Sequence, residues 1–427
     1  MDGYKQRIMD GLLQKKLQAK GAVLIEGPKW CGKTTTAEEI AASKVMLSRT
    51  DVKNSFRSLL EIDTDAALAG DAPMLIDEWQ TVPKLWDAVR YTVDHRRKMG
   101  QFILTGSAVP DKDAESEREH SGTGRFAWLT MRPMTLFESG ESNGTVSLGH
   151  LFTGPEKVLE KNYLKLRDIA FLICRGGWPM SVGLPEEAAL EQAFDYYDAV
   201  TKEDVTKADG VKRASARVQR LMRAYARHQG TQASIATLKE DLKNNDTTAL
   251  DESTISSYLE VLRKIFVVED MPAWNPNLRS KTAIRTADTR YFVDPSIATA
   301  ALGLGPADLM DDLNTMGFLF EALCIRDLRV FAEALNGCVY HFRDKSGLEC
   351  DAVVHLRNGQ YGLVEIKLGG ESLINDGVRT LNALTGQIDT THMKAPAFRM
   401  ILIATGEYAY RRPDDGIYVV PIGCLRH

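Results

Sequence analysis

The sequence has few cysteines, and their arrangement does not point to a metal site. Six cysteines are spread over 427 residues, without a Cys-x-x-Cys pair and without histidines at the spacing of a zinc site. They are Cys31, Cys174, Cys324, Cys338, Cys350 and Cys424. This scatter predicts reduced structural thiols and argues against a zinc-binding protein.

The sequence also lacks a long apolar run and a strong charge of either sign. No run reaches membrane-spanning length, and residues 1–16 interleave charged and apolar residues where a signal peptide has an apolar core. We therefore expect a cytoplasmic protein without a membrane partner. The net charge is only -5, so a case for nucleic acid has to come from local clusters of basic residues.

The composition does provide enough apolar material for several cores. Hydrophobic residues make up 44% and charged residues 26% of the chain, as in ordinary globular proteins. A chain of 427 residues is expected to form two to four domains. Its first third alternates apolar runs at 21–27, 72–78 and 101–108 with a helical pattern at 83–98. This alternation predicts a parallel β-sheet with helices on both faces.

A complete phosphate-binding P-loop follows the first apolar run. The sequence GPKWCGKT at 27–34 matches the pattern GxxxxGK[ST] between a strand and a helix. Its glycines let backbone N–H groups surround phosphates, Lys33 neutralises the β- and γ-phosphates, and the Thr34 hydroxyl binds Mg²⁺. The residues expected to bind ATP are Gly27, Pro28, Cys31, Gly32, Lys33, Thr34 and Thr35. The alternative is a glycine turn that arises by chance.

Two later strand ends carry residue types that complete an ATPase site. In MLIDE, residues 74–78, a buried strand delivers Asp77 to the metal ion, and Glu78 follows as base for the attacking water. Thr105 and Ser107 end the next strand, where a hydroxyl reaches the γ-phosphate or orients water. The alternatives are a solvated turn for the two acids and an ordinary polar strand end for the two hydroxyls. With a P-loop upstream, we expect ATP hydrolysis.

The rest of the chain predicts three further parts. Residues 156–228 have helical patterns throughout, apart from an interruption at 175–185. Shorter helical segments follow, with Asp251 as an N-cap, and two β-patterns around a basic stretch complete the outline of a winged helix. After Leu313, a helix and short strands indicate a second α/β unit.

Four residues near the C-terminus form a D…ExK constellation. Asp351 starts one strand pattern, Glu365 and Lys367 end the next, and Glu321 lies on the preceding helix. Neighbouring strands bring such carboxylates together to bind Mg²⁺, while the lysine positions the attacking water. Gln387 is a further candidate to orient the water or the lysine. The pattern is similar to the PD-(D/E)xK nuclease superfamily; the alternative to cleavage is an inherited fold that serves assembly or grips DNA.

Basic residues cluster in two places. Residues 212–228 contain no acid and place several arginines on one helical face, and a second basic stretch lies in the expected wing. The residues expected to contact DNA are Arg213, Arg217, Arg220, Arg227, Arg279, Lys281 and Arg285. Aromatic residues are sparse there, which favours contacts with a duplex backbone over stacking on single strands. A solvated face or pairing between subunits is the alternative.

Together, these blocks resemble a family of prokaryotic AAA+ ATPases whose C-terminal half is a domain of unknown function with a winged helix and a nuclease-like end. The resemblance rests on GPKWCGKTT, LIDEWQ, LTGS, GRFAWLTMRPMTLFES and RGGWP, and covers most of residues 20–370. It implies a homo-oligomer, usually a ring and most often a hexamer, with each nucleotide between subunits. Arg125 is similar to the family's trans-acting arginine finger, or is a surface arginine. Pro179 is similar to part of a motif that contacts the base, or belongs to a tight turn.

The sequence therefore predicts a multidomain α/β protein. Its parts are an AAA+ P-loop core with a parallel sheet at 1–150, a helical lid at 151–210, a winged-helix domain at 211–305 and a restriction-endonuclease-like α/β domain at 306–427. The leading functional prediction is an oligomeric ATPase that uses ATP and Mg²⁺ to bind and process or remodel duplex or branched DNA. The alternatives are an ATP-switched regulatory or defence scaffold whose nuclease-like domain only binds, and a Mg²⁺-dependent DNA nuclease regulated by ATP.

Overall fold

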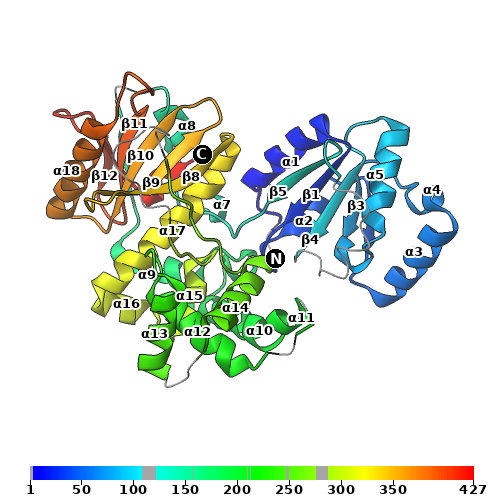
Figure 1. Cartoon of the computed structure of the whole chain (residues 1–427). Helices are drawn as coiled ribbons and strands as arrows, with labels where there is room; N and C mark the ends of the chain where they lie inside the picture. Colours follow the sequence, from blue (N-terminus) through cyan, green and yellow to red (C-terminus); the bar gives the residue numbers. More distant parts are fainter. Residues whose placement is uncertain are drawn as a thin grey trace. The chain divides into compact units, whose positions relative to one another are not determined.

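The computed structural model describes residues 3–107, 122–155, 157–208, 210–211, 213–246, 250–275 and 287–427 (Figure 1). The chain forms two compact units. Unit 1 contains Met1–Pro133, Lys202–Arg213 and Tyr258–Val267, and unit 2 contains Met134–Thr201, Ala214–Ser257 and Val268–His427. Neither unit is one continuous stretch of sequence, because the chain leaves unit 1 and returns to it twice.

Unit 1 is built on a parallel β-sheet. Its strands are β1 (Ala22–Glu26), β2 (Ser43–Met46), β3 (Met74–Asp77), β4 (Phe102–Gly106) and β5 (Phe126–Thr130), in the order β2-β3-β4-β1-β5. Every neighbouring pair runs parallel. The apolar runs at 21–27, 72–78 and 101–108 contain β1, β3 and β4, which confirms the predicted parallel sheet.

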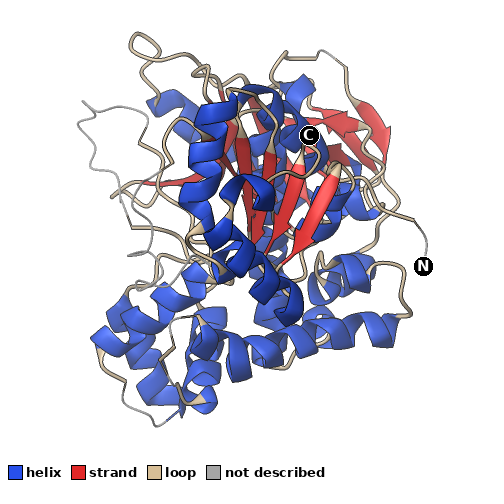
Figure 2. Cartoon of the chain, turned by 90° about the vertical axis from the view of Figure 1, so that its right-hand side faces the viewer, coloured by secondary structure: helices blue, strands red, loops and turns tan. Residues whose placement is uncertain are grey.

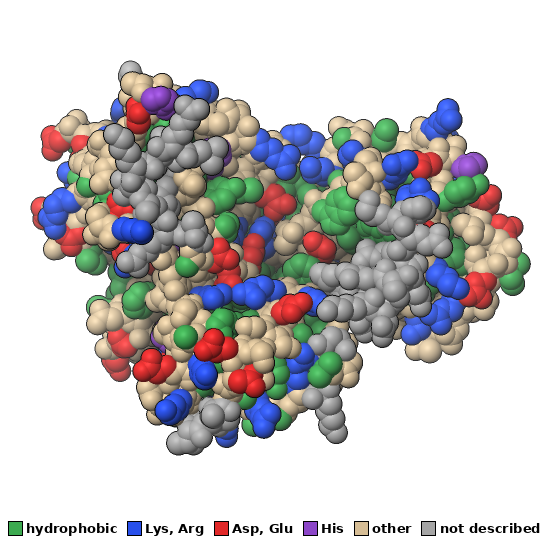
Figure 3. Space-filling model, viewed as in Figure 1, with side chains coloured by type: hydrophobic (Ala, Val, Ile, Leu, Met, Phe, Trp, Pro, Cys, Tyr) green, Lys and Arg blue, Asp and Glu red, His purple; other side chains and the backbone are tan. Residues whose placement is uncertain are grey.

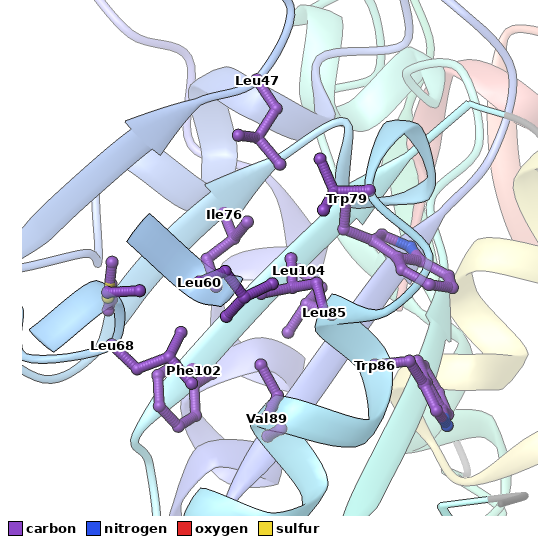
Figure 4. Close-up of a cluster of buried hydrophobic side chains, with 14 of the residues drawn as sticks. Leu47, Leu60, Leu68, Ile76, Trp79, Leu85, Trp86, Val89, Phe102 and Leu104 are labelled. Atoms are coloured by element: carbon purple, nitrogen blue, oxygen red, sulfur yellow. The ribbon is translucent and has the colours of Figure 1, made fainter. Parts of the chain in front are cut away.

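Helices cover both faces of this sheet (Figure 2). The helical elements of unit 1 are α1 (Ile8–Ala19), α2 (Lys33–Glu38), α3 (Thr50–Ile62), α4 (Thr64–Ala67), η1 (Trp79–Thr81), α5 (Leu85–Arg96) and α11 (Val205–Lys207). Successive side chains of a strand point to opposite faces, so each strand feeds two apolar clusters. On one face Ile76 and Leu104 meet Leu85 and Trp86 of α5 (Figure 4), and on the other face α1 and α2 pack against the sheet. Each buried aliphatic side chain stabilises the fold by about 1.5–3 kcal/mol.

Unit 2 combines a largely helical part with a second sheet. Its helices are α7 (Leu136–Ser139), α8 (Leu148–Leu151), α9 (Leu166–Arg175), α10 (Glu186–Ala199), α12 (Ser215–Arg227), α13 (Ile235–Asp246), α15 (Pro295–Leu302), α16 (Pro306–Asp311), α17 (Leu313–Ala334) and α18 (Glu371–Gln387). Helix α14 (Glu252–Lys264) is divided between the two units. The short elements η2 (Pro179–Ser181) and η4 (Ile422–Cys424) also belong to unit 2, and η3 (Val200–Asp204) is divided between the two units.

The second sheet is mixed and has the order β7-β12-β13-β11-β10-β9-β8. Its strands are β7 (Leu159–Lys161), β8 (Gly337–Arg343), β9 (Glu349–Leu356), β10 (Tyr361–Lys367), β11 (Phe398–Ile403), β12 (Tyr408–Arg411) and β13 (Tyr418–Pro421). Strands β8, β9 and β10 form an antiparallel meander, and α18 then crosses over so that β11 lies parallel to β10. Val378 and Leu381 of α18 pack against Val353 and Leu363 in the core of this sheet. Separately, β14 (Leu425–Arg426) pairs with β6 (Val146–Ser147).

One expectation from the sequence is wrong within the region predicted to be all-helical. Residues 159–161 form strand β7, which pairs antiparallel with β12 at the edge of the second sheet. Three residues carry no periodic pattern of their own, so pairing with a distant strand decides their conformation. The same contact joins the predicted lid region to the C-terminal sheet within unit 2.

Residues 215–292 contain the elements from which the winged helix was predicted. Helices α12, α13 and α14 are followed by an antiparallel pairing of Val268 with Phe292 and of Met271 with Thr289. The carboxylate of Asp251 accepts the backbone N–H of Thr254 at 2.7 Å, which confirms the predicted N-cap of α14. In the parts of the chain that the structure describes, no helix is both long enough and apolar enough to span a membrane.

Candidate functional site

The residues predicted to bind and hydrolyse ATP meet at one edge of the unit 1 sheet. Strands β1, β3 and β4 run parallel, so their carboxyl ends lie together. The P-loop follows β1, Asp77 ends β3, and Thr105 is paired with Asp77 in the register of β3 and β4. Parallel pairing thereby gathers residues that are far apart in the sequence.

The P-loop has a backbone that accepts only glycine at its first position. Gly27 has φ of 150°, and a Cβ there would lie 2.1 Å from the carbonyl oxygen of Met131. Gly32 has φ of 101° and is the N-cap of α2. The loop therefore leads directly into a helix N-terminus, whose unpaired N–H groups and dipole favour an anion.

The side chains of the P-loop differ in what they offer to a ligand. Lys33 is buried, and its Nζ donates to the carbonyl oxygens of Gly27 at 3.0 Å and Pro28 at 2.7 Å. Thr35 is exposed. The Cys31 side chain is fully buried in an apolar cluster, so only its backbone is available to a nucleotide.

Asp77 connects the P-loop to the end of β4. Its Oδ1 accepts hydrogen bonds from the hydroxyls of Thr34 and Thr105, each at 2.7 Å, and the residue is 4% exposed. The carboxylate predicted to bind the metal thus orients the Thr34 hydroxyl, which is also predicted to bind it. The same carboxylate orients the Thr105 hydroxyl, which is predicted to reach the γ-phosphate or to orient water. Buried networks of this kind hold their members in one arrangement.

Glu78 occupies a strained position directly after β3. It has φ of 55°, in the left-handed region that residues other than glycine seldom adopt. Its carboxylate accepts hydrogen bonds from Gln80 at 2.5 Å and from Ser107 at 3.3 Å. Gln80 was not predicted as a site residue, although its spacing in DEWQ, two positions after the expected base, is the signal that marks it.

Arg7 is a second residue that the sequence does not single out. Its guanidinium, 5% exposed, donates to the carbonyl oxygens of Cys31 at 2.8 Å and Arg132 at 2.9 Å. It therefore ties the turn before α1 to the P-loop and to the segment after β5. A lone arginine ahead of the first strand carries no motif, so only the folded structure reveals this role.

Arg125 lies at the opposite edge of the sheet from the P-loop. Its carbonyl oxygen accepts the N–H of Ala22 at the start of β1, and β5 begins with the next residue. The five residues of β1 span roughly 16 Å at the usual rise of a strand, which is longer than an arginine side chain. The guanidinium donates to both carboxylate oxygens of Asp94, at 2.8 and 3.1 Å.

The RGGWP segment is built into the core of unit 2. A Cβ on Gly177 would lie 2.2 Å from the carbonyl oxygen of Met134, and the Gly177 N–H donates to Asp294 at 3.0 Å. The indole of Trp178 is 1% exposed and donates to Ser296 at 2.9 Å. Pro179 follows at the start of η2 and is half-buried. These contacts give the motif a packing role within unit 2.

The D…ExK residues come together in unit 2 on neighbouring antiparallel strands. Lys367 Nζ lies 3.2 Å from Asp351 and 2.7 Å from Glu365, and the Ile366 N–H donates to Asp351 at 2.7 Å. Burial lowers the pKa of Lys367, but the charges of Asp351 and Glu365 outweigh it and raise this pKa. Burial and the Asp351 charge raise the pKa of Glu365 to about 8.

Glu321 joins this cluster from α17. Burial and the charge of Asp351 raise the pKa of Glu321 to about 8, while the hydroxyl of Tyr291, which hydrogen-bonds to Glu321, acts in the opposite direction. Tyr291 is fully buried and comes from the strand segment after the predicted wing. It was not predicted, because its partner lies 30 positions away.

The cluster is not arranged as a set of three metal ligands. Among the residues that the structure describes, no three His, Cys, Asp or Glu side chains lie close enough to hold one metal ion. Lys367 instead bridges two of the carboxylates, and Glu365 Oε1 is buried without a hydrogen-bond partner. The expectation for Gln387 is wrong. The part of α18 that lies against Glu365 is Gly377, and Gln387 is exposed ten residues further along the helix, a distance of about 15 Å.

The predicted basic stripe has two kinds of arginine. Arg217 and Arg220 are exposed on α12. Arg227 donates three hydrogen bonds to Asp241 of α13, two of them at 3.0 and 3.1 Å, and Arg213 lies over the ring of Tyr258. Arg279, Lys281 and Arg285 fall outside the described residues. On the face shown in Figure 3, basic and acidic side chains are interspersed.

Curated relatives and solved structures were found for most of the chain. The uncharacterized proteins Mb2031c of Mycobacterium bovis and Rv2008c of Mycobacterium tuberculosis are each 24% identical over 370 residues, covering 86% of this chain and 75% of theirs. A replication initiator DnaA bound to AMPPCP and single-stranded DNA is 14% identical, with a TM-score of 0.28, and covers 61% of this chain and 89% of its own. The Aeropyrum pernix ORC1 protein in complex with DNA is 12% identical, with a TM-score of 0.26 and coverages of 70% and 93%. TM-scores this low carry no information on the function of the chain.

Three family models match successive parts of the chain. Residues 19–139 match an AAA domain, residues 166–308 match a domain of unknown function, DUF8612, and residues 316–425 match another, DUF4143. The first match contains the P-loop, Asp77, Glu78 and Arg125. The resemblance is confirmed in this coarser form: the chain joins an AAA domain to a C-terminal domain of unknown function.

Proposed function

We propose that the chain is an oligomeric AAA+ ATPase that couples ATP hydrolysis to the binding and remodelling of DNA. The observation that carries the ATPase part is the hydrogen-bonded set of Thr34, Asp77 and Thr105 beside Glu78. It combines the two residue types that bind nucleotide-associated Mg²⁺ with a carboxylate placed to act on water. The match of residues 19–139 to an AAA domain supports the same conclusion.

The residues present fit ATP and Mg²⁺. The fit rests on the glycine-only backbone at Gly27 and on Lys33, a buried ammonium group among backbone carbonyls. Thr34 and Asp77 would hold the ion, which supplies positive charge to the phosphates, and Lys33 would bind the β- and γ-phosphates. Thr35, next to Thr34 on α2, is proposed as a further hydroxyl group that binds ATP.

Glu78 is the proposed general base for the attacking water. Gln80 and Ser107 both donate to Oε2 of its carboxylate, which orients the carboxylate before water binds. The strained backbone at Glu78 also turns the residue away from the path that a regular continuation of β3 would take. Next to it in the sequence, Asp77 is held by a separate hydrogen bond from Thr105.

Oligomerisation is proposed from the position of Arg125. The guanidinium lies at the edge of the sheet that is remote from its own P-loop, so a role at γ-phosphate requires a neighbouring copy of the chain. A closed assembly with one nucleotide per interface, a ring and most simply a hexamer, satisfies this requirement for every subunit.

DNA is the proposed partner because unit 2 carries exposed arginines on a helix next to a winged-helix arrangement. Arg217 and Arg220 would contact phosphates of duplex or branched DNA, together with Arg279, Lys281 and Arg285. Arg213 and Arg227 belong to the same proposed surface, and each has a contact within the chain, as Arg220 also does.

A second candidate function is Mg²⁺-dependent cleavage of DNA at Asp351, Glu365 and Lys367, regulated by ATP. It is favoured by the buried, unpaired Oε1 of Glu365, which is an acceptor that a cation would satisfy. The bridging position of Lys367 favours the opposite interpretation, an ATP-switched scaffold in which this domain only binds. Glu321 would be an outer ligand in the first case and a buried structural acid in the second.

Assays on the full chain distinguish these functions. We expect Glu78→Gln to lower the ATPase rate by roughly 10²- to 10⁴-fold without loss of ATP binding, because a general base contributes about that much. The matched control is Glu61→Gln, an exposed glutamate on α3. Duplex or branched DNA at low salt should raise the wild-type rate; no binding and no stimulation would remove DNA from the proposal. Mg²⁺-dependent cutting of a labelled duplex that Glu365→Ala abolishes would establish the nuclease.

A further inference from the structure

The P-loop carries a second lysine that the proposed ATPase site does not use. Lys29 is the third residue of the loop, and its side chain is 46% exposed. Lys33, in contrast, is buried among backbone carbonyls. The loop has only eight residues, so the side chain of Lys29 begins within about 10 Å, one Debye length, of phosphates that the loop holds. Its charge therefore acts on any nucleotide bound there.

Lys29 has a partner of opposite charge in the same unit. Its Nζ lies 2.5 Å from Oδ1 of Asp204, whose side chain is only 12% exposed. Asp204 belongs to the segment Lys202–Arg213, which is part of unit 1 together with the P-loop. The charge of Lys29 also acts on Glu203, although the hydrogen bond from Lys207 contributes more to lowering the pKa of Glu203. Two acids therefore lie near this cation of the P-loop.

The backbone at Asp204 departs from a regular α-helix. Asp204 is the last residue of the π-helix η3, and α11 begins at the next residue, Val205, which is 1% exposed. A π-turn holds one more residue than an α-turn, so it rotates the side chains at its end by roughly 100° relative to a continuous α-helix. Such turns are rare and occur frequently at functional sites. The local backbone thus sets the direction of Asp204, whereas Lys29 has a long, flexible side chain that can change its partner.

The contact between Lys29 and Asp204 competes with a nucleotide. A carboxylate beside the P-loop repels phosphates, and it occupies the ammonium group that would attract them. An ion pair whose lysine is half-exposed is weak, because water screens it. A triphosphate carries more negative charge than one carboxylate, so it attracts the same lysine more strongly.

We propose that Lys29 is a further ATP-binding residue, which exchanges the Asp204 carboxylate for a phosphate group of ATP. Asp204 is a competing partner, because its contact with Lys29 lowers the affinity for ATP. ATP binding in turn breaks the contact of Asp204 with the P-loop, since the two effects are reciprocal. The proposal rests on the ATP binding in the proposed function and deepens it by one residue and its competitor.

The first test is the affinity of the full chain for the non-hydrolysable analogue AMPPCP in the presence of Mg²⁺. Lys29→Gln should weaken binding by roughly ten-fold or more, the loss expected for one charge-assisted hydrogen bond. Asp204→Asn should tighten binding by roughly two- to five-fold, because one exposed ion pair no longer competes. The matched controls are Lys44→Gln and Glu38→Gln, which break another lysine–glutamate pair of unit 1, at 2.7 Å, and should leave the affinity unchanged.

The second test shows whether Asp204 acts through Lys29. In the Lys29→Gln background, Asp204→Asn should give no further gain in affinity, because no cation is left to release. A gain in affinity from Asp204→Asn alone does not arise from misfolding, so this variant keeps the test valid if Lys29→Gln perturbs the loop.

The results also separate this inference from the proposed function. Equal gains from Asp204→Asn with and without Lys29 overturn the inference, and so does an unchanged affinity in Lys29→Gln. In both cases a wild type that binds the nucleotide leaves the ATPase proposal standing. A wild type that binds no nucleotide overturns both.

Discussion

Arg326 is a buried residue that serves two carboxylates in unit 2. Its guanidinium donates to Asp294 at 2.9 Å and to Asp327 at 2.9 Å, and all three side chains are almost fully buried. Asp327 also accepts the N–H of Leu136 at 2.9 Å. One cation therefore faces two potential anions in a place that water does not reach. Such an arrangement favours a protonated carboxyl group.

We expect the stability of the Asp327→Asn variant to differ from that of the wild type in a pH-dependent way. Burial raises the pKa of Asp327 to about 6, above the ordinary aspartate value of about 3.9, so the folded state binds the proton more tightly. Relative to the variant, the wild type therefore loses unfolding free energy as pH rises from about 4 to about 6, on the order of 2–3 kcal/mol. Urea unfolding at several pH values measures this difference.

A difference between the two proteins that is constant from pH 4 to pH 7, or that grows in favour of the wild type, contradicts the raised pKa. Asp51→Asn serves as the control, because the carboxylate that it removes is exposed on the surface of unit 1.

The meeting of the P-loop, Asp77 and Thr105 at one end of the sheet was predictable from the sequence, and the contacts of Glu78 and Arg125 were not. The P-loop, Asp77 and Thr105 follow from strand ends and residue type, because parallel pairing brings such ends together. Asp94 has no motif of its own, and Gln80 is marked only by its spacing in DEWQ. Each is significant only through a contact with a predicted residue, which is a property of the fold.

At the scale of elements, the turn between α9 and η2 shows how tightly unit 2 is packed. The Gly177 backbone is bound to Asp294, the N-cap of α15, and it passes directly against the backbone of Met134. Position 177 is a glycine because no side chain fits between the two backbones. RGGWP therefore packs between helices of unit 2. The sequence alone had left two interpretations of this segment, a tight turn or a contact with the nucleotide base.

We expect Gly177→Ala to destabilise unit 2 by more than about 2 kcal/mol. A Cβ at 2.2 Å from the carbonyl oxygen of Met134 forces the backbone apart, and overpacking of this kind costs about 1–3 kcal/mol or more. Gly317→Ala is the matched control, because Gly317 lies inside α17 with no atom near its added Cβ and should gain roughly 0.5–1 kcal/mol. Thermal unfolding measures both. Equal effects in the two variants would contradict the packing role.

Helices and strands were predicted well where the sequence carries a local pattern. They were predicted poorly where contacts with distant segments decide the conformation. The strands β1, β3 and β4 and the N-cap at Asp251 agree with the sequence, because apolar runs and capping are local signals. Strand β7 and the distance of Gln387 from Glu365 were missed. Both depend on which element lies alongside, and a single sequence does not record that.

At the scale of the whole molecule, DNA affinity should depend on salt through a few arginines. We expect Arg217→Ala combined with Arg220→Ala to reduce the slope of log K against log salt by roughly 1–2, since each phosphate contact contributes about 0.9. Arg167→Ala is the control, because Arg167 is an exposed arginine on α9 outside the proposed surface. Fluorescence anisotropy with a duplex at several salt concentrations gives the slopes. An identical slope in all three proteins would place the DNA contacts elsewhere.

The pairing of β6 with β14 has a consequence for synthesis of the chain on the ribosome. Ser147 donates to the carbonyl oxygen of His427 across 280 positions, and β7 likewise pairs with β12. Early strands of unit 2 therefore emerge hundreds of residues before their partners, and contacts so distant in sequence form slowly. We therefore expect the edges of β6 and β7 to stay unpaired during translation until β14 and β12 have been synthesised.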